Sequence, residues 1–204
     1  MKKDILYYVL DPMCSWCWGF SKTWSAIKSS LSDEISIQYV MGGLAPDSNE
    51  PMTDEMRDYI QTMWRKIERS VPGTKFNYDF WTNCSPRRST YLACRAVIAI
   101  RKQNPSLEEQ MINSIQHTYY IEAKNPSDDS TLIDLASKLD IDIEQFKKTL
   151  NNNETQSLLF EDISITKQLG TQGFPSLFYK DSREIRPLQI DYNNPRIILD
   201  QISY

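Results

Sequence analysis

The side chains best suited to chemistry are the two thiols of the segment Cys14-Ser15-Trp16-Cys17. A thiolate attacks a disulfide to form a mixed disulfide, and a second thiol nearby then attacks the first sulfur and releases the product. The spacing of this segment places both sulfurs within one turn of a helix, as the exchange requires. The segment therefore predicts a redox-active pair.

Two cysteines at this spacing also occur in zinc ribbons and in c-type haem attachment sites. Trp18 stands where a haem site has histidine, so haem is not expected. Cys84 and Cys94 would complete four zinc ligands, although their spacing does not match the second cysteine pair of a ribbon. We expect no metal and no organic cofactor, with a zinc site as the alternative.

The elements on either side of the pair predict different roles for the two sulfurs. An unbroken apolar run over residues 5–10 predicts a strand covered on both faces, which ends near Asp11 because Pro12 lacks an N–H. Cys14 then lies at the start of a helix, where free N–H groups and the helix dipole stabilise a thiolate. We therefore assign Cys14 as the nucleophile and Cys17 as the resolving thiol. The buried stripe of that helix is expected to contain Cys17, Phe20, Trp24, Ile27 and Leu31.

A proline precedes another apolar run far along the chain, in Gly173-Phe174-Pro175-Ser176. By itself, such a proline is typical of a loop that enters an edge strand. Together with the cysteine pair, however, the chain resembles the thioredoxin superfamily, in which a proline before the third strand is cis and faces the dithiol. Within it, the chain is similar to the DsbA-like family and to the FrnE-related cytoplasmic branch, which is described as predicted protein-disulfide isomerases.

The resemblance covers nearly the whole chain and includes residues 86–96 and 125–128. It implies an α/β, thioredoxin-like fold of the order β-α-β and then β-β-α, interrupted by a large all-helical insertion. We expect the thioredoxin-like domain at residues 1–43 and 155–204 and the helical insertion domain at residues 44–154.

The same resemblance implies how the site works. Pro175 would be the cis-proline beside the dithiol, and the backbone around Phe174 would pair with an extended substrate segment. Apolar side chains around Cys14 would receive exposed hydrophobic segments of a client. We therefore expect substrate contacts from Met13, Ser15, Trp16, Trp18 and Phe174.

Hydrophobic spacing and turn residues predict the remaining elements. Strands are expected at about residues 34–41, 177–179 and 184–188. A helix is expected from Ser106, with Glu109 completing a capping box, and another from Asp142 with Gln145. The other expected helices contain Met56 to Ile67, Leu132 to Leu139, Leu158 to Leu169 before Gly170, and the residues from Pro195 onward.

Composition limits the partners and the compartment. A net charge of −4 over 204 residues gives no electrostatic footprint for nucleic acid or an anionic membrane. The apolar run near the N-terminus is too short for a signal-peptide core, so we expect a cytoplasmic protein, where disulfides are mostly transient and catalytic. The expected partners are client protein thiols and disulfides or glutathione.

Three weaker candidates have ordinary structural interpretations as well. His117, the single histidine, lies off its helical stripe and is expected at the surface. Cys84 and Cys94 would form a second redox pair or remain free, with Cys94 in an apolar helical run. An anion such as a glutathione carboxylate would suit Arg87, Arg88 and Arg95, although arginines more often solvate a helix face.

These observations predict an enzyme, a protein-disulfide oxidoreductase or isomerase that exchanges disulfides through Cys14 and Cys17. The alternative is a glutathione-dependent isomerase or transferase of the kappa-class or 2-hydroxychromene-2-carboxylate isomerase type. That branch resembles this fold but typically has serine at the nucleophile position, so Cys14 favours the oxidoreductase.

Overall fold

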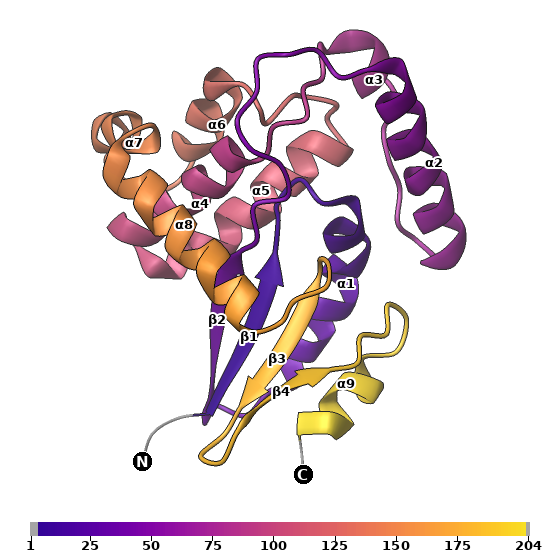
Figure 1. The fold of residues 1–204 in the computed structure, drawn as a ribbon, viewed down its shortest axis with the longest axis vertical. Helices are drawn as coiled ribbons and strands as arrows, with labels where there is room; N and C mark the ends of the chain where they lie inside the picture. Colours follow the sequence, from indigo (N-terminus) through magenta and orange to yellow (C-terminus); the bar gives the residue numbers. More distant parts are fainter. Residues whose placement is uncertain (1–3, 203–204) are drawn as a thin grey trace.

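The structure, a computed structural model, describes residues 4–202 (Figure 1). A four-stranded sheet lies at one end and most of the helices lie at the other. The elements follow in the order β1 (Asp4–Leu10), α1 (Ser15–Ser30), β2 (Ile35–Met41), α2 (Asp54–Ser70), α3 (Phe80–Asn83), α4 (Tyr91–Gln103), the 3₁₀ turn η1 (Pro105–Leu107), α5 (Glu108–Tyr120), α6 (Asp129–Ala136), α7 (Ile143–Leu150), α8 (Asn153–Gln168), β3 (Ser176–Lys180), β4 (Ile185–Leu188) and α9 (Pro195–Ile202).

The strands are arranged in the order β2-β1-β3-β4. Strand β1 pairs with β2 in parallel and with β3 antiparallel, and β3 pairs with β4 antiparallel. Helix α1 provides the crossover between the parallel strands, as parallel pairing requires. This is the predicted thioredoxin-like sheet, and the predicted fold class is confirmed.

Strand β1 is buried on both faces, which explains its unbroken apolar sequence. Leu6, Tyr8 and Leu10 belong to the main core, where the Tyr8 ring packs 4.5 Å from that of Trp24 in α1. Tyr7 and Val9 point the other way and join a smaller apolar cluster packed against Ile165 and Leu169 at the end of α8. The alternation follows from the two-residue repeat of a strand.

The segment between β2 and β3 is helical, as predicted, and α4 lies at its centre. Every residue of α4 from Leu92 to Ile100 is buried, and the helix packs against α5, α7 and α8. Helix α2 stands apart from this group, on the other side of the α1 N-terminus (Figure 1). The expected domain boundaries, after residues 43 and 154, stay a prediction.

Local capping predictions were right at one helix and wrong at another. The Asp142 carboxylate accepts from the Gln145 N–H, as predicted for α7. Ser106, however, does not cap α5: its N–H donates to the Asn104 side chain, which opens the 3₁₀ turn that precedes α5. Pro105 suits the first position of such a turn because it has no N–H to leave unpaired.

An ion cluster around Arg101 fastens the helices to the edge of the sheet. The Arg101 guanidinium donates to Glu108 at 3.3 Å, to Asp162 at 3.1 Å and to the carbonyl of Tyr39 in β2 at 3.3 Å. Asp162 also accepts from the Met41 N–H at 3.0 Å. The cluster therefore links α4, α5 and α8 to β2, and one guanidinium serves two carboxylates.

Because the single guanidinium of Arg101 pairs with two buried carboxylates, the free energy of unfolding should depend on pH. Burial raises the pKa of Glu108 from 4.5 to about 7, although Arg101 opposes the rise. The native state then binds a proton that the unfolded state has lost, so this contribution to stability falls as pH rises from about 4.5 to about 7. We expect Glu108→Gln to gain about 1–3 kcal/mol relative to the native protein between pH 5 and pH 8 in urea unfolding.

Glu55→Gln, an exposed site in α2, makes the same change in charge and is the control. Its unfolding free energy should follow that of the native protein at every pH. If the unfolding free energy of Glu108→Gln also follows that of the native protein at every pH, the role given to the Arg101 cluster is wrong.

Candidate active site

Cys14 lies immediately before α1, at the N-cap position, and Cys17 lies in the first turn of the helix. The Cys14 backbone is extended, and its carbonyl accepts from the Trp18 N–H at 3.1 Å. Cys14 is 7% exposed, whereas Cys17 is fully buried, and both are free thiols. The predicted difference in exposure between the two sulfurs is therefore present, although even Cys14 is largely covered.

The surroundings shift the pKa values of the two thiols in opposite directions. A hydrogen bond from the Cys17 thiol lowers the pKa of Cys14, and the N–H groups of Cys17 and Trp16 act the same way, while burial and Asp11 oppose them. Burial raises the pKa of Cys17 well above its ordinary value, and the hydrogen bond to Cys14 adds to the rise. Cys14 is thus the more readily ionised sulfur, as a nucleophile must be.

The Phe174–Pro175 peptide bond is cis, as predicted, and it lies beside the cysteine pair. The Cys14 thiol donates to the Phe174 carbonyl oxygen at an Sγ–O distance of 3.6 Å. Pro175 itself is buried. The Phe174 ring rests on Gly42, where an added Cβ would lie 2.2 Å from two ring carbons, so glycine is needed for this close approach.

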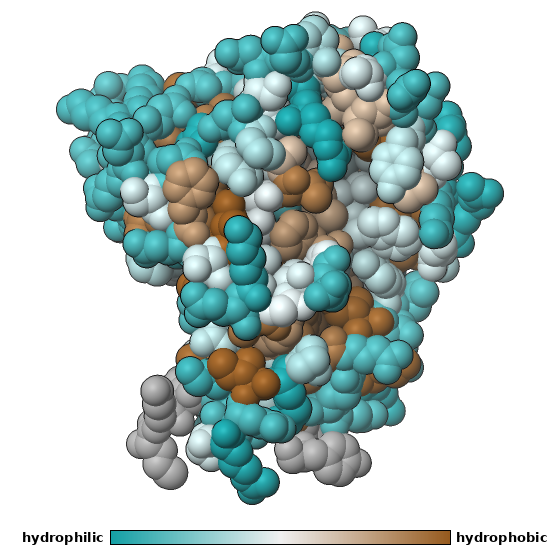
Figure 2. All heavy atoms as spheres, viewed as in Figure 1, coloured by the Kyte–Doolittle hydropathy of each residue, from teal (hydrophilic) through white to brown (hydrophobic). Residues whose placement is uncertain are grey.

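A cleft of about 470 Å³ opens over Cys14. On the face shown in Figure 2, apolar side chains gather in the middle, between the end of β1 and helices α2 and α4, with polar side chains around them. The residues that line the cleft include Met13, Cys14, Ser15, Trp16, Leu44, Met52, Tyr59, Ile60, Met63, Trp64, Arg87, Arg88, Ser89, Thr90, Tyr119 and Phe174.

Four of the five predicted substrate contacts line this cleft, and Trp18 does not. Its ring stacks on Tyr120 at 5.7 Å, and its indole N–H donates to the Lys75 carbonyl at 3.0 Å. Trp16 and Trp18 point to different sides because residues two apart on a helix are separated by about 200°.

Asp11 is the site residue that sequence reasoning missed. It is fully buried, and its carboxylate accepts from the N–H of Met13 at 2.8 Å, the N–H of Leu44 at 2.7 Å and the Thr90 hydroxyl at 2.6 Å. Burial raises the pKa of Asp11, although these donors oppose the rise. One signal for Asp11 is present in the sequence. Aspartate side chains commonly accept a hydrogen bond from the backbone N–H two residues later, which here is that of Met13.

The weaker candidates have separate surroundings. His117 is 56% exposed at its side chain and lies 3.4 Å from Glu122. Cys94 is buried with its thiol 3.5 Å from Asp11, while the half-buried Cys84 donates to the Ala123 carbonyl at 3.2 Å. Within residues 4–202, no group of three or more histidine, cysteine or acidic side chains is arranged to hold a metal ion.

The three arginines proposed for anions differ as well. Arg95 is buried against Asp47, Gln156 and the Leu150 carbonyl, so its charge is used in packing α4. Arg87 is paired with Asp128. Arg88 is exposed and lines the cleft. No helix in the described part of the chain is long and apolar enough to cross a membrane.

Solved structures share this fold. A candidate protein disulfide isomerase from Nitrosomonas europaea is 25% identical and superposes with a TM-score of 0.85, covering 98% of this chain and 97% of its own. The cytosolic disulfide reductase DsbM from Pseudomonas aeruginosa is 20% identical with a TM-score of 0.76, covering 91% of this chain and 89% of its own. Both are described as proteins of disulfide chemistry.

Curated relatives carry a different description. ClpXP adapter proteins SpxH from Halalkalibacterium halodurans and Bacillus subtilis are each 22% identical, over 97% and 98% of this chain. The chain spans 65% and 66% of the length of these two relatives. The family model described as thioredoxin matches residues 7–197. Since that match covers almost the whole chain and the solved structures share its fold from end to end, the protein belongs to the thioredoxin family.

Proposed function

We propose that the protein is a thiol–disulfide oxidoreductase in which Cys14 is the nucleophile and Cys17 the resolving thiol. The observation that carries the proposal is the pairing, in one helical turn, of a thiol that is 7% exposed and has a lowered pKa with a fully buried thiol of raised pKa. The Phe174 carbonyl beside Cys14 supports it, because a Cys14 thiolate no longer donates to this carbonyl, which can then pair with an extended substrate segment.

The exchange proceeds in two displacements. The Cys14 thiolate attacks one sulfur of the substrate disulfide, which forms a mixed disulfide and releases the other sulfur as a thiolate. Cys17 then loses its proton to solvent or to the leaving sulfur and attacks Cys14 Sγ. The Cys14–Cys17 disulfide forms, the second substrate thiol leaves, and two electrons have passed to the substrate. The reverse sequence oxidises a dithiol substrate.

The proposed substrates are protein thiols and disulfides or glutathione, and the proposed compartment is the cytoplasm. A solved structure of DsbM contains glutathione, and DsbM is described as cytosolic. The apolar wall of the cleft, which includes Met13, Trp16 and Leu44, suits apolar segments of a client.

The shared name of the curated relatives favours a second candidate function, binding to ClpXP as an adapter. Such binding needs no thiol chemistry. Calorimetric titration of purified ClpXP with the native chain and with the Cys14→Ala/Cys17→Ala variant tests this candidate. No binding to the native chain would overturn the adapter function. Equal affinity of both chains would support an adapter that does not use the thiols, and loss of affinity in the variant would make the thiols part of the interaction.

The redox function itself predicts a reversible couple. The protein is equilibrated in buffers of graded ratio of reduced to oxidised glutathione, quenched with acid and analysed by mass spectrometry. We expect one two-electron transition between the Cys14–Cys17 dithiol and disulfide. Cys14→Ser should abolish the transition. If no ratio of buffers produces the disulfide, the oxidoreductase proposal fails; turnover of a small aromatic acid that survives in Cys14→Ser would instead favour the isomerase alternative.

The pKa shifts predict selective alkylation. Since the pKa of Cys14 is lowered and that of Cys17 is raised, iodoacetamide should label Cys14 well below the pH at which an ordinary thiol reacts, while Cys17 stays protected in the native reduced protein. Mass mapping between pH 4 and pH 9 measures both rates in one sample. Similar labelling of the two sulfurs would contradict the assignment.

Removing the resolving thiol should trap the intermediate. Cys17→Ala should accumulate a mixed disulfide on Cys14 under oxidising conditions because the second displacement is lost. Cys84→Ala, which removes a half-buried thiol outside the pair, should resolve the adduct as the native protein does. An adduct that is equally short-lived in Cys17→Ala would show that another group resolves it.

A further inference from the structure

Arg88 is a cation without a protein partner at the mouth of the cleft. Its side chain is exposed, and it makes no ion pair or hydrogen bond to any residue in the range 4–202. Its neighbour Arg87 is held by Asp128 and the Ser127 carbonyl. Of the two arginines that line the cleft, Arg88 therefore has its guanidinium free to bind a ligand.

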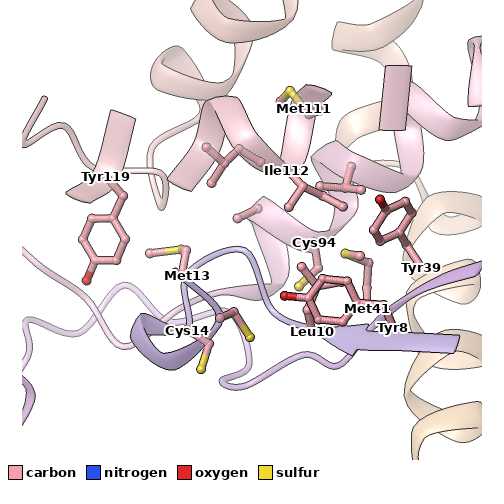
Figure 3. Close-up of a cluster of buried hydrophobic side chains, with 14 of the residues drawn as sticks. Tyr8, Leu10, Met13, Cys14, Tyr39, Met41, Cys94, Met111, Ile112 and Tyr119 are labelled. Atoms are coloured by element: carbon pink, nitrogen blue, oxygen red, sulfur yellow. The ribbon is translucent and has the colours of Figure 1, made fainter. Parts of the chain in front are cut away.

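Tyr119 presents a second polar group without a partner to the same cleft. The residue is 5% exposed, and its ring is packed edge-on against Phe80 at 4.7 Å. Its hydroxyl makes no hydrogen bond within the described residues, whereas the hydroxyl of Tyr120 donates to the Met13 carbonyl at 2.7 Å. This hydroxyl is not one of the fully buried unpartnered polar atoms among the described residues, and Tyr119 lines the cleft, so the hydroxyl is open to a ligand there. Figure 3 shows Met13 between Tyr119 and Cys14.

The two groups lie near one another. Burial raises the pKa of Tyr119, and the positive charge of Arg88 is the largest effect that opposes the rise. A guanidinium and a hydroxyl are both donors, and together they match the two oxygens of a carboxylate. The residues that line the cleft include no aspartate or glutamate, so the lining offers no competing acid.

We infer that Arg88 and Tyr119 form a carboxylate-binding subsite beside Cys14, and that the substrates include small disulfides that carry carboxylates, of the glutathione type. The inference rests on the proposed function and names a substrate class for it. A volume of about 470 Å³ lies within the range of roughly 300–1,000 Å³ typical of small-molecule sites. Binding a carboxylate would satisfy the Tyr119 hydroxyl and place the disulfide over Cys14.

Glutathione disulfide would oxidise the cysteine pair in two displacements. The Cys14 thiolate attacks one sulfur of glutathione disulfide, the disulfide bond breaks, and one glutathione thiolate leaves. Cys17 attacks Cys14 Sγ and releases the second glutathione. Its proton passes to a released thiolate, the protein dithiol loses two electrons, and two molecules of glutathione are formed.

The test compares two disulfides that differ in charge. Reduced protein is mixed with glutathione disulfide or with bis(2-hydroxyethyl) disulfide, which has no carboxylate, and oxidation of the pair is followed by acid quenching and mass spectrometry. Arg88→Gln should slow the reaction with glutathione disulfide about 10- to 100-fold, as expected for loss of a hydrogen-bonded ion pair. Tyr119→Phe should slow it several-fold, and Arg88→Lys should recover part of the rate.

None of these variants should change the rate with bis(2-hydroxyethyl) disulfide by more than about twofold, since no carboxylate contact is lost. Arg183→Gln is the matched control, because Arg183 is exposed in the turn between β3 and β4 and does not line the cleft. It should leave both rates unchanged, which separates a local subsite from the effect of net charge.

The failures of the two proposals are distinguishable. Equal slowing of both disulfides by Arg88→Gln, or no slowing of either, would overturn the subsite and leave the oxidoreductase intact. An equal effect of Arg183→Gln on glutathione disulfide would also overturn it. If neither disulfide oxidises the native pair, the proposed function fails and the subsite fails with it.

Discussion

The antiparallel register of β1 and β3 is the constraint on which the active site depends. Val9 pairs with Ser176, so the chain that leaves β1 and the chain that enters β3 lie at the same end of the sheet. Five residues beyond Val9 is Cys14, and two residues before Ser176 is Phe174, and their contact follows although 160 positions separate them. A shift of one residue in this pairing would turn Tyr7 and Val9 toward the main core. The residues that follow β1 would then lie on the opposite face of the sheet. The apolar sequences of both faces of β1 prevent that shift.

Asp11 then fixes the loop that the register has placed. Its carboxylate joins the turn before Cys14 to Leu44, after β2, and to Thr90, before α4. Burial of an ion costs several kcal/mol, and hydrogen bonds to a charged group return about 1.5–3 kcal/mol each. The raised pKa of Asp11 shows that burial exceeds what its donors return. The same charge raises the pKa of Cys17 and opposes the lowering of the pKa of Cys14, so the residue that positions the two thiols also limits how acidic Cys14 becomes.

Local patterns in the sequence predicted what local forces decide. The all-apolar run before Pro12, the helical stripe from Cys17 to Ile27 and the Asp142 cap each depend on neighbours within a few residues, and the structure has all three. Leu31, expected to end the stripe, is instead half-buried just after the last residue of α1. Pro175, before β3, indicates a cis-proline only in combination with the distant pair Cys14 and Cys17; by itself it is typical of a loop. The Arg101–Asp162 pair, the support of Phe174 on Gly42 and the bonds of Asp11 to Leu44 and Thr90 join residues 33 to 132 positions apart, and spacing along the chain carries no signal for such contacts. Short α3 was missed because four residues are too few for a periodic stripe.

The site divides its work between the two parts of the fold. The sheet and α1 supply the sulfurs and the Phe174 carbonyl, groups whose positions are fixed by strand register and by the start of a helix. The helical segment supplies much of the rest of the cleft, including apolar side chains of α2 together with Arg88 and Tyr119. Because the helices meet the sheet through the Asp11 bonds and the Arg101 cluster, changes on the cleft-facing side chains of α2 need not disturb the dithiol. The groups that hydrogen-bond to the Cys14 thiol belong to the first turn of α1 and to Phe174, whereas the described side chains of α2, Arg88 and Tyr119 line the cleft without bonding to either sulfur. That part of the lining can therefore vary without changing the bonds of the two thiols.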